Sequence, residues 1–180
     1  MANFKLLLLV ALAIPLRPFE GCAQDAAFTR FAILLSEAGV DYLAPADAGY
    51  SPIRIAKNSF QRHNFAVYSR EEQLEIRFLI EPLRDSQEVS PHLRAMTLVT
   101  HLATNDEGAA IAVHSLPPAP YHADWSKAFY FQPKPLFSHR KHCKIIALYK
   151  EGRGMAFVFY LFDEANEAVD EREMILQFLE

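Results

Sequence analysis

The sequence GMAFVFYLF at Gly154–Phe162 decides the fold, because it places large apolar side chains on both faces of one extended segment. Side chains of a β-strand alternate between its two faces. Phe157 and Phe159 therefore share one face, whereas Val158 and Tyr160 share the other. A strand that is apolar on both faces is typical of the centre of a sheet covered on both sides. The segment therefore predicts a sheet that lies between two other layers.

Neighbouring segments supply further strands of an antiparallel sheet. Lys150–Arg153 contains a glycine suited to a positive φ and predicts a turn back to a strand at His142–Tyr149, which follows another strand at Lys127–Gln132. Earlier in the chain, His63–Ser69 and Gln73–Ile80 predict a hairpin, because the second segment alternates apolar with mainly polar residues. Shorter extended segments are expected at 40–43 and 52–56.

Two segments carry clear helix signals. Asp25–Ala38 has apolar residues at the three- and four-residue spacing of an amphipathic helix, and Gly39 ends it. Ser90 is a capping residue, and Pro91 after it suits the first helical position. These two residues predict a second helix, which ends near Asn105 to Gly108.

The remaining stretches are expected to be less regular or short. Prolines at 117, 118 and 120 break regular structure within 109–126, where a single helical turn near Tyr121–Trp125 is expected. Asp170 is expected to cap a closing helix, whose apolar residues are Met174, Ile175, Phe178 and Leu179.

The order of these elements predicts an α+β fold. Helices are needed on both faces of the sheet, so the expected architecture is an α/β/α sandwich with one antiparallel sheet flanked by helices. The alternative is a two-layer ferredoxin-like fold.

The N-terminus has the three parts of a secretory signal peptide in the right order. Lys5 supplies a positive charge, and the run from Leu6 to Leu16 carries no charge. Such a run is too short for a membrane span, which needs about 20 apolar residues. Small residues at Gly21 and Ala23 predict cleavage before Gln24. We therefore expect a signal peptide at 1–23, a single domain at 24–180 and no transmembrane span.

Export places the mature chain in the periplasm or outside the cell. Cys22 offers an alternative, a lipoprotein with a lipid anchor on that residue, although Glu20 makes the preceding residues a poor lipoprotein signal. The leader holds two of the chain's 18 basic and one of its 22 acidic residues, so the mature chain carries 16 basic and 21 acidic side chains and a formal charge of −5. This acidic balance argues against nucleic acid as a partner.

Several segments carry a resemblance to a known fold. Three features carry it: the stretch from Ala44 to Tyr50 that leads to the hairpin, the strand LEIRFLIEPL at Leu74–Leu83, and the order of elements. Together they resemble the PsbP-like (Mog/PsbP-like) fold over about 40–180. Photosystem accessory proteins, a Ran-binding nuclear transport factor and many exported bacterial proteins share that fold. Further segments look like those of exported bacterial proteins with no assigned activity: Ala123–Trp125, His142–Lys144, Leu148–Gly152 and Tyr160–Glu164. The resemblance implies a binding or assembly factor rather than an enzyme, and it transfers no site residue.

The segment 139–144 is the densest cluster of functional side chains. His139, His142 and Cys143 are weak candidates for metal ligands, because imidazole and thiolate suit zinc or copper but three such groups do not complete a ligand set. The alternative is a basic loop that leads into a strand with Cys143 as a small buried residue. The basic residues of the segment, Arg140, Lys141 and Lys144, are a candidate patch for an acidic partner.

No pattern in the sequence indicates catalysis or a cofactor. Cys143 as a nucleophile needs a base within reach, but its neighbour His142 points to the opposite face of a strand. Glycine-rich phosphate loops and nucleophile elbows are absent from the sequence. Glu75 and Arg77 share one face of a strand, where they either line a polar groove or lie at a solvated sheet edge.

Three functions stay open on the sequence. The first is an exported cell-envelope protein that binds an unknown protein or small ligand without catalysis, as a binding or assembly factor. The second is a carrier of small molecules or lipids, which a large apolar cavity between sheet and helices favours. The third is an enzyme, which a cleft with several converging ionisable groups favours.

Overall fold

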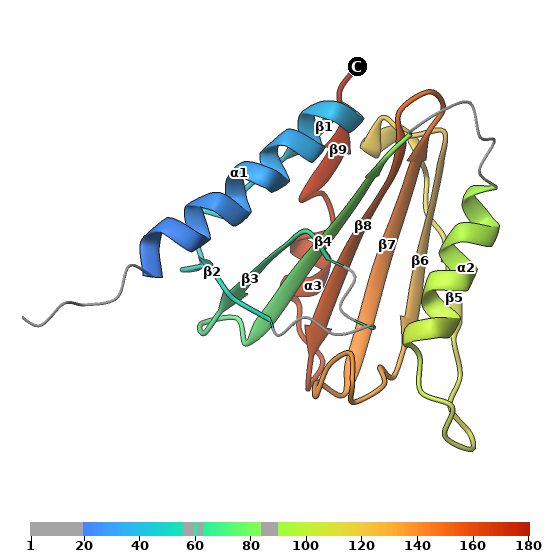
Figure 1. Ribbon diagram of the computed structural model, residues 1–180. Helices are drawn as coiled ribbons and strands as arrows, with labels where there is room; N and C mark the ends of the chain where they lie inside the picture. The colour runs from blue at the N-terminus through green and yellow to red at the C-terminus, as the bar shows by residue number, and fades with distance from the viewer. Residues whose placement is uncertain (1–19, 56–59, 61–62, 84–89) are drawn as a thin grey trace, which may run out of the picture.

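The computed structural model describes residues 20–55, 60, 63–83 and 90–180. Its centre is an antiparallel sheet of seven strands (Figure 1). The spatial order of the strands is β2 (Ser51–Pro52), β3 (Phe65–Ser69), β4 (Leu74–Pro82), β8 (Gly154–Phe162), β7 (His142–Lys150), β6 (Trp125–Phe131) and β5 (Ala112–Ser115). A smaller sheet pairs β1 (Val40–Tyr42) with β9 (Leu176–Phe178).

Strand β8 lies in the centre of the large sheet, between β4 and β7. Phe157 and Val158 point to opposite faces, and each has at most 1% of its surface exposed. We call the side of Val158 the first face and the side of Phe157 the second face. Both faces are covered, so the predicted central position of this strand is confirmed.

The first face packs against the N- and C-terminal parts of the chain. Helix α1 (Glu20–Ala38) lies against β3 and β4, and β1, β9 and the short helix α3 (Ala168–Glu171) lie beside it (Figure 1). Phe31 of α1 stacks on Phe65, with ring centroids 4.9 Å apart. One continuous core therefore joins the two ends of the chain to the sheet.

The second face is covered by α2 (Pro91–Leu102). Its predicted start is confirmed: the Ser90 hydroxyl accepts a hydrogen bond from the Leu93 N–H at 3.4 Å. The helix ends before Asn105, because the next residues pair with the end of β6: the N–H of Thr104 donates to the carbonyl of Gln132 at 2.8 Å. With helices on both faces, the predicted sandwich is confirmed and the two-layer alternative is wrong.

Three segments differ from the prediction. The helical turn expected at Tyr121–Trp125 lies earlier, at Ala119–Tyr121, and Trp125 begins β6. The expected closing helix is wrong: α3 is one turn long, and Leu176 and Phe178 belong to β9, where both point into the first core. Ala112–Ser115 forms β5 although no strand was expected there. All four of its side chains are exposed, so neither face of the strand had to be apolar and no burial pattern marks it in the sequence. The prolines that break regular structure begin only after the strand, at 117.

The start of β8 is fixed by a close approach of backbones. Gly154 has a φ of +123°, and a Cβ at this position would lie 2.2 Å from the carbonyl oxygen of Glu81. Only glycine fits there, which sets the register of β8 against β4.

The predicted leader 1–23 lies largely outside the described residues; its last four residues belong to α1. Among the described residues, no helix is both long and apolar enough to cross a bilayer.

Candidate functional site

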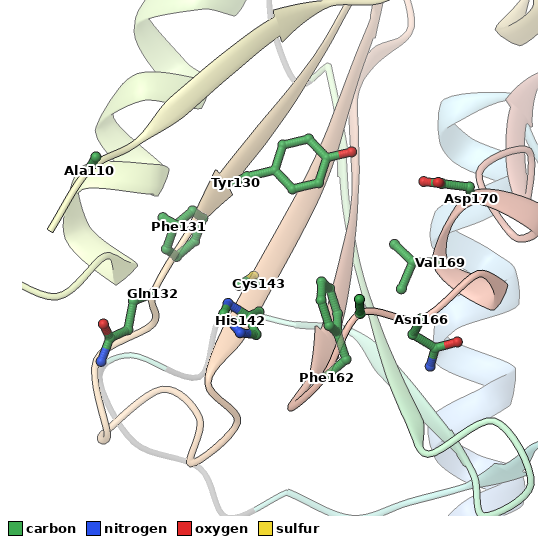
Figure 2. A pocket seen from close by; sticks show the side chains of 11 residues that line it. Ala110, Tyr130, Phe131, Gln132, His142, Cys143, Phe162, Asn166, Val169 and Asp170 are labelled. Atoms are coloured by element: carbon green, nitrogen blue, oxygen red, sulfur yellow. The ribbon is translucent and has the colours of Figure 1, made fainter.

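A pocket of about 540 Å³ opens between the first face of the sheet and the segment around α3 (Figure 2). In the part of the chain that the structure describes, its lining residues are Ala110, Tyr130, Phe131, Gln132, His142, Cys143, Phe162, Ala165, Asn166, Val169 and Asp170. We call it the α3 pocket. Its volume lies within the range of small-molecule sites, about 300–1,000 Å³.

The sheet wall of the α3 pocket is aromatic. Tyr130 of β6, His142 of β7 and Phe162 of β8 reach the same face because His142 pairs with Phe162 and Tyr130 pairs with Lys144, two residues further along β7. The rings of His142 and Phe162 lie 5.6 Å apart, measured between centroids. Three neighbouring strands therefore present ring systems to the pocket.

The opposite wall comes from the segment that leads into α3. Asn166 holds this segment in place: its side-chain nitrogen donates to the carbonyl of Glu72 at 2.6 Å, and its Oδ1 accepts the N–H of Ala168 at 3.0 Å. Val169 is buried in the first core, whereas the side chain of Asp170 is 79% exposed. Figure 2 shows the Asp170 carboxylate pointing across the gap toward the Tyr130 hydroxyl.

Lys144 contacts Asp170 and Tyr130 of the pocket lining and has no exposed side-chain surface. Its Nζ binds Asp170 Oδ1 at 2.8 Å and also contacts the Glu173 carboxylate. Burial acts to lower the pKa of Lys144, but hydrogen bonds to Asp170, Glu173 and Tyr130 together outweigh it and raise the pKa above its usual value. The amine is therefore charged at neutral pH, and it holds α3 against the sheet.

The structure separates the three candidate metal ligands. Cys143 is buried among the apolar side chains of the second face, and burial raises the pKa of its thiol. His142 is exposed on the other face, and His139 is exposed in the loop before β7. Within the described ranges, no three His, Cys, Asp or Glu side chains converge as a metal site would require.

The candidate basic patch is divided as well. Arg140 Nη1 binds Asp163 Oδ2 at 2.6 Å, and the Lys141 N–H donates to Asp163 Oδ1 at 3.1 Å. The hydrogen bond from Arg140 lowers the pKa of Asp163. Lys144 is buried and paired with Asp170 instead, so the surface patch consists of Arg140 and Lys141.

Glu75 and Arg77 line a second pocket, of about 700 Å³, on the second face. Arg77 Nε binds Glu75 Oε1 at 2.6 Å, and Arg77 Nη1 donates to the carbonyl of Phe137 at 2.9 Å. Both side chains are largely buried. The two residues therefore share a face, as predicted, and form a buried ion pair in a polar groove rather than a solvated edge.

Sequence reasoning missed most of the α3 pocket. Asp170 was interpreted as a helix cap, and neither Tyr130 nor Glu173 carried a functional signal. One signal was present: Lys144 lies within an apolar strand, and a buried amine needs counter-charges. That requirement calls for acidic side chains opposite β7, which Asp170 and Glu173 supply.

Comparisons with known proteins concern the fold. No family model and no curated protein matches the chain. Among solved structures, the chain is similar to the solution structure of cyanobacterial PsbP (CyanoP) from Synechocystis sp. PCC 6803, with 8% sequence identity and a TM-score of 0.44. The match covers 80% of this chain and 89% of that chain.

Proposed function

We propose that the chain is an exported binding protein without catalytic activity that takes a small ligand in the α3 pocket. One observation carries the proposal: the pocket is open and aromatic on one side, and it has a mainly exposed carboxylate, Asp170, on the other. Pockets with apolar and aromatic walls and few polar groups are typical of small-molecule sites. Export is supported by the leader at 1–23.

The ionisable groups near the pocket favour binding over catalysis. A nucleophile needs an activating base or a lowered pKa. Burial raises the pKa of Cys143, and its side chain packs in the second core. Lys144 is held in its charged form by two carboxylates, so its nitrogen has no free electron pair to attack a substrate.

The filled core argues against a lipid carrier. A carrier of long acyl chains needs an enclosed apolar cavity between sheet and helices. The large side chains at those places, including Phe31, Phe78 and Tyr160, are fully buried and pack against one another. The α3 pocket is instead open to solvent, and the polar side chains of Asp170 and Asn166 belong to its lining.

A fragment screen followed by NMR tests the proposal. Binding should shift the backbone amide signals of Tyr130, Asn166 and Val169. Ala165 is exposed and lines the pocket, so Ala165→Trp should fill the space and abolish these shifts without loss of stability. Glu164→Trp, at an exposed neighbour outside the lining, is the control. Fragments that bind elsewhere, or that still bind the Ala165→Trp variant at the same amides, would contradict the proposal.

A further inference from the structure

We propose that the α3 pocket selects organic cations, in which an ammonium group is attached to an apolar or aromatic body. The inference rests on the proposed function and names its ligand class. It follows from the charge around the pocket, from the aromatic wall, and from the place where the protein's own ammonium group lies.

The charge around the pocket is negative. One ammonium group, that of Lys144, is shared by the carboxylates of Asp170 and Glu173, so the three groups keep a net charge of −1 at neutral pH. Glu173 is mostly buried, whereas Asp170 is mostly exposed and lines the pocket. Lys144 occupies Asp170 Oδ1, and Oδ2 accepts no hydrogen bond from any residue that the structure describes. One carboxylate oxygen is therefore left for a donor in the pocket.

The aromatic wall has the geometry to bind a cation. The face of an aromatic ring attracts an ammonium group within about 6 Å of its centroid. Lys144 Nζ already lies 5.3 Å from the centroid of Tyr130 while it binds Asp170 Oδ1 at 2.8 Å. A ligand ammonium on the solvent side of Asp170 meets the same two kinds of group, a carboxylate and the rings of Tyr130 and Phe162 (Figure 2).

The described part of the pocket lining offers no positively charged group that would bind an anion in the way that Asp170 and the rings bind a cation. Among the described residues that line it, Asp170 is the charged one, and neither lysine nor arginine is present. The nearby ammonium of Lys144 is buried and already shared by two carboxylates, so a ligand carboxylate or phosphate would meet the exposed Asp170 carboxylate without a free cation, which costs binding energy. The remaining lining, including Ala110, Ala165 and Val169, suits the apolar body of a ligand.

Three probes with the same benzyl body test the charge selectivity: benzylammonium, benzyl alcohol and phenylacetate. Titrations of the purified protein are followed through the amide signals of Asn166 and Val169. We expect the cation to bind about tenfold more tightly than the alcohol. We also expect added salt to weaken binding of the cation and to leave binding of the alcohol unchanged.

Two variants and one control assign the effect to the pocket. Asp170→Asn should lower the affinity for the cation about tenfold and leave the affinity for benzyl alcohol within about twofold. Phe162→Leu keeps an apolar side chain but removes a ring, and it should lower the affinity for the cation about twofold to fivefold. Glu171→Gln removes the same charge from an exposed neighbour outside the lining and should change neither affinity.

The outcomes separate the inference from the proposed function. Benzyl alcohol or phenylacetate binding as tightly as the cation overturns the inference and leaves a small-molecule pocket in place. Equal effects of Asp170→Asn and Glu171→Gln on the affinity for the cation would likewise overturn the inference and leave the small-molecule pocket in place. If none of the three probes shifts the pocket amides at millimolar concentration, both the inference and the proposed function fail.

Discussion

Cys143 and Lys144 are neighbours on β7, and the alternation of the strand gives them opposite environments. The thiol points into the second core among apolar side chains, and burial raises its pKa. The amine points toward the first face and is paired with two carboxylates. The two side chains look reactive in the sequence, but in the fold Cys143 is an inert core residue and Lys144 forms a structural ion pair.

The first prediction concerns the reactivity of Cys143. The thiolate is the reactive form, and a buried thiol with a raised pKa provides little of it. We expect Cys143 to react with a thiol reagent only after urea unfolds the protein. Cys143→Ala should leave metal content unchanged, as measured by elemental analysis. Rapid labelling of the folded protein, or a metal that is lost in the variant, would revive the metal site at 139–143.

The second prediction concerns the pH dependence of stability at Asp163. Its pKa is lowered chiefly by the hydrogen bond from Arg140. A lowered folded-state pKa adds stability above the ordinary value of about 3.9, and this stability disappears as the pH falls through the folded-state pKa. The gap in unfolding free energy between the native chain and Asp163→Asn should therefore be present at neutral pH and shrink in acid.

Urea unfolding at pH 6 and at about pH 3 measures this gap. Glu164→Gln, which removes a carboxylate from an exposed neighbour, is the matched control. A gap for Asp163→Asn that grows in acid would contradict the assigned direction.

Strand β8 is the element on which the sandwich depends. Its residues pair with β4 on one side and β7 on the other, so neither edge is exposed. Its side chains belong to both cores: Val158 packs in the first core, and Phe157 packs in the second core. Because the strand is buried on both faces and at both edges, its sequence has almost no polar position.

The third prediction compares truncations on the two faces of β8. Phe157→Ala should lower the free energy of unfolding by about 3–5 kcal/mol, through lost burial and a cavity. Val158→Ala should lower it by about 1–3 kcal/mol, because fewer buried atoms are removed. Urea unfolding measures both values. If either variant is as stable as the native chain, the corresponding face of β8 is not packed in solution.

Elements were predictable from the sequence where local signals and burial agree. The alternation in β4, the two apolar faces of β8 and the Ser90–Pro91 start of α2 are of this kind. β9 was not predictable, because Leu176 and Phe178 fit a short helix or a strand equally well, and only pairing with β1 decides between them. The α3 pocket was not predictable either: Tyr130 and Asp170 meet only through the fold.

The whole molecule has two separate cores, one on each side of the sheet. The first core contains α1, whose side chains Phe31, Leu35 and Ala38 are buried. The predicted cleavage before Gln24 falls within the first turns of α1 and upstream of all three of these residues. Removal of the leader therefore leaves the buried part of the helix in place.

The fourth prediction concerns export. Mass spectrometry of the protein isolated from its native host should find an N-terminus at Gln24, or a lipid-modified Cys22. The expectation rests on the order of charge, apolar run and small residues in the leader. Intact chains that begin at Met1 in the soluble cytosolic fraction would contradict it. Ala23→Arg, which removes a small residue from the cleavage site, should slow processing.

The pairing of β1 with β9 makes the order of synthesis matter. Val40 lies opposite Phe178, and the Leu179 N–H donates to the carbonyl of Gly39 at 2.8 Å. A ribosome adds about 5–20 residues per second, so β1 emerges on the order of ten seconds before β9. During that interval β1 presents an open edge, a hazard for association with other chains. If the chain is exported, chaperones or a translocation channel would bind it during this period. Strand β9 would then pair with the edge of β1 only after release.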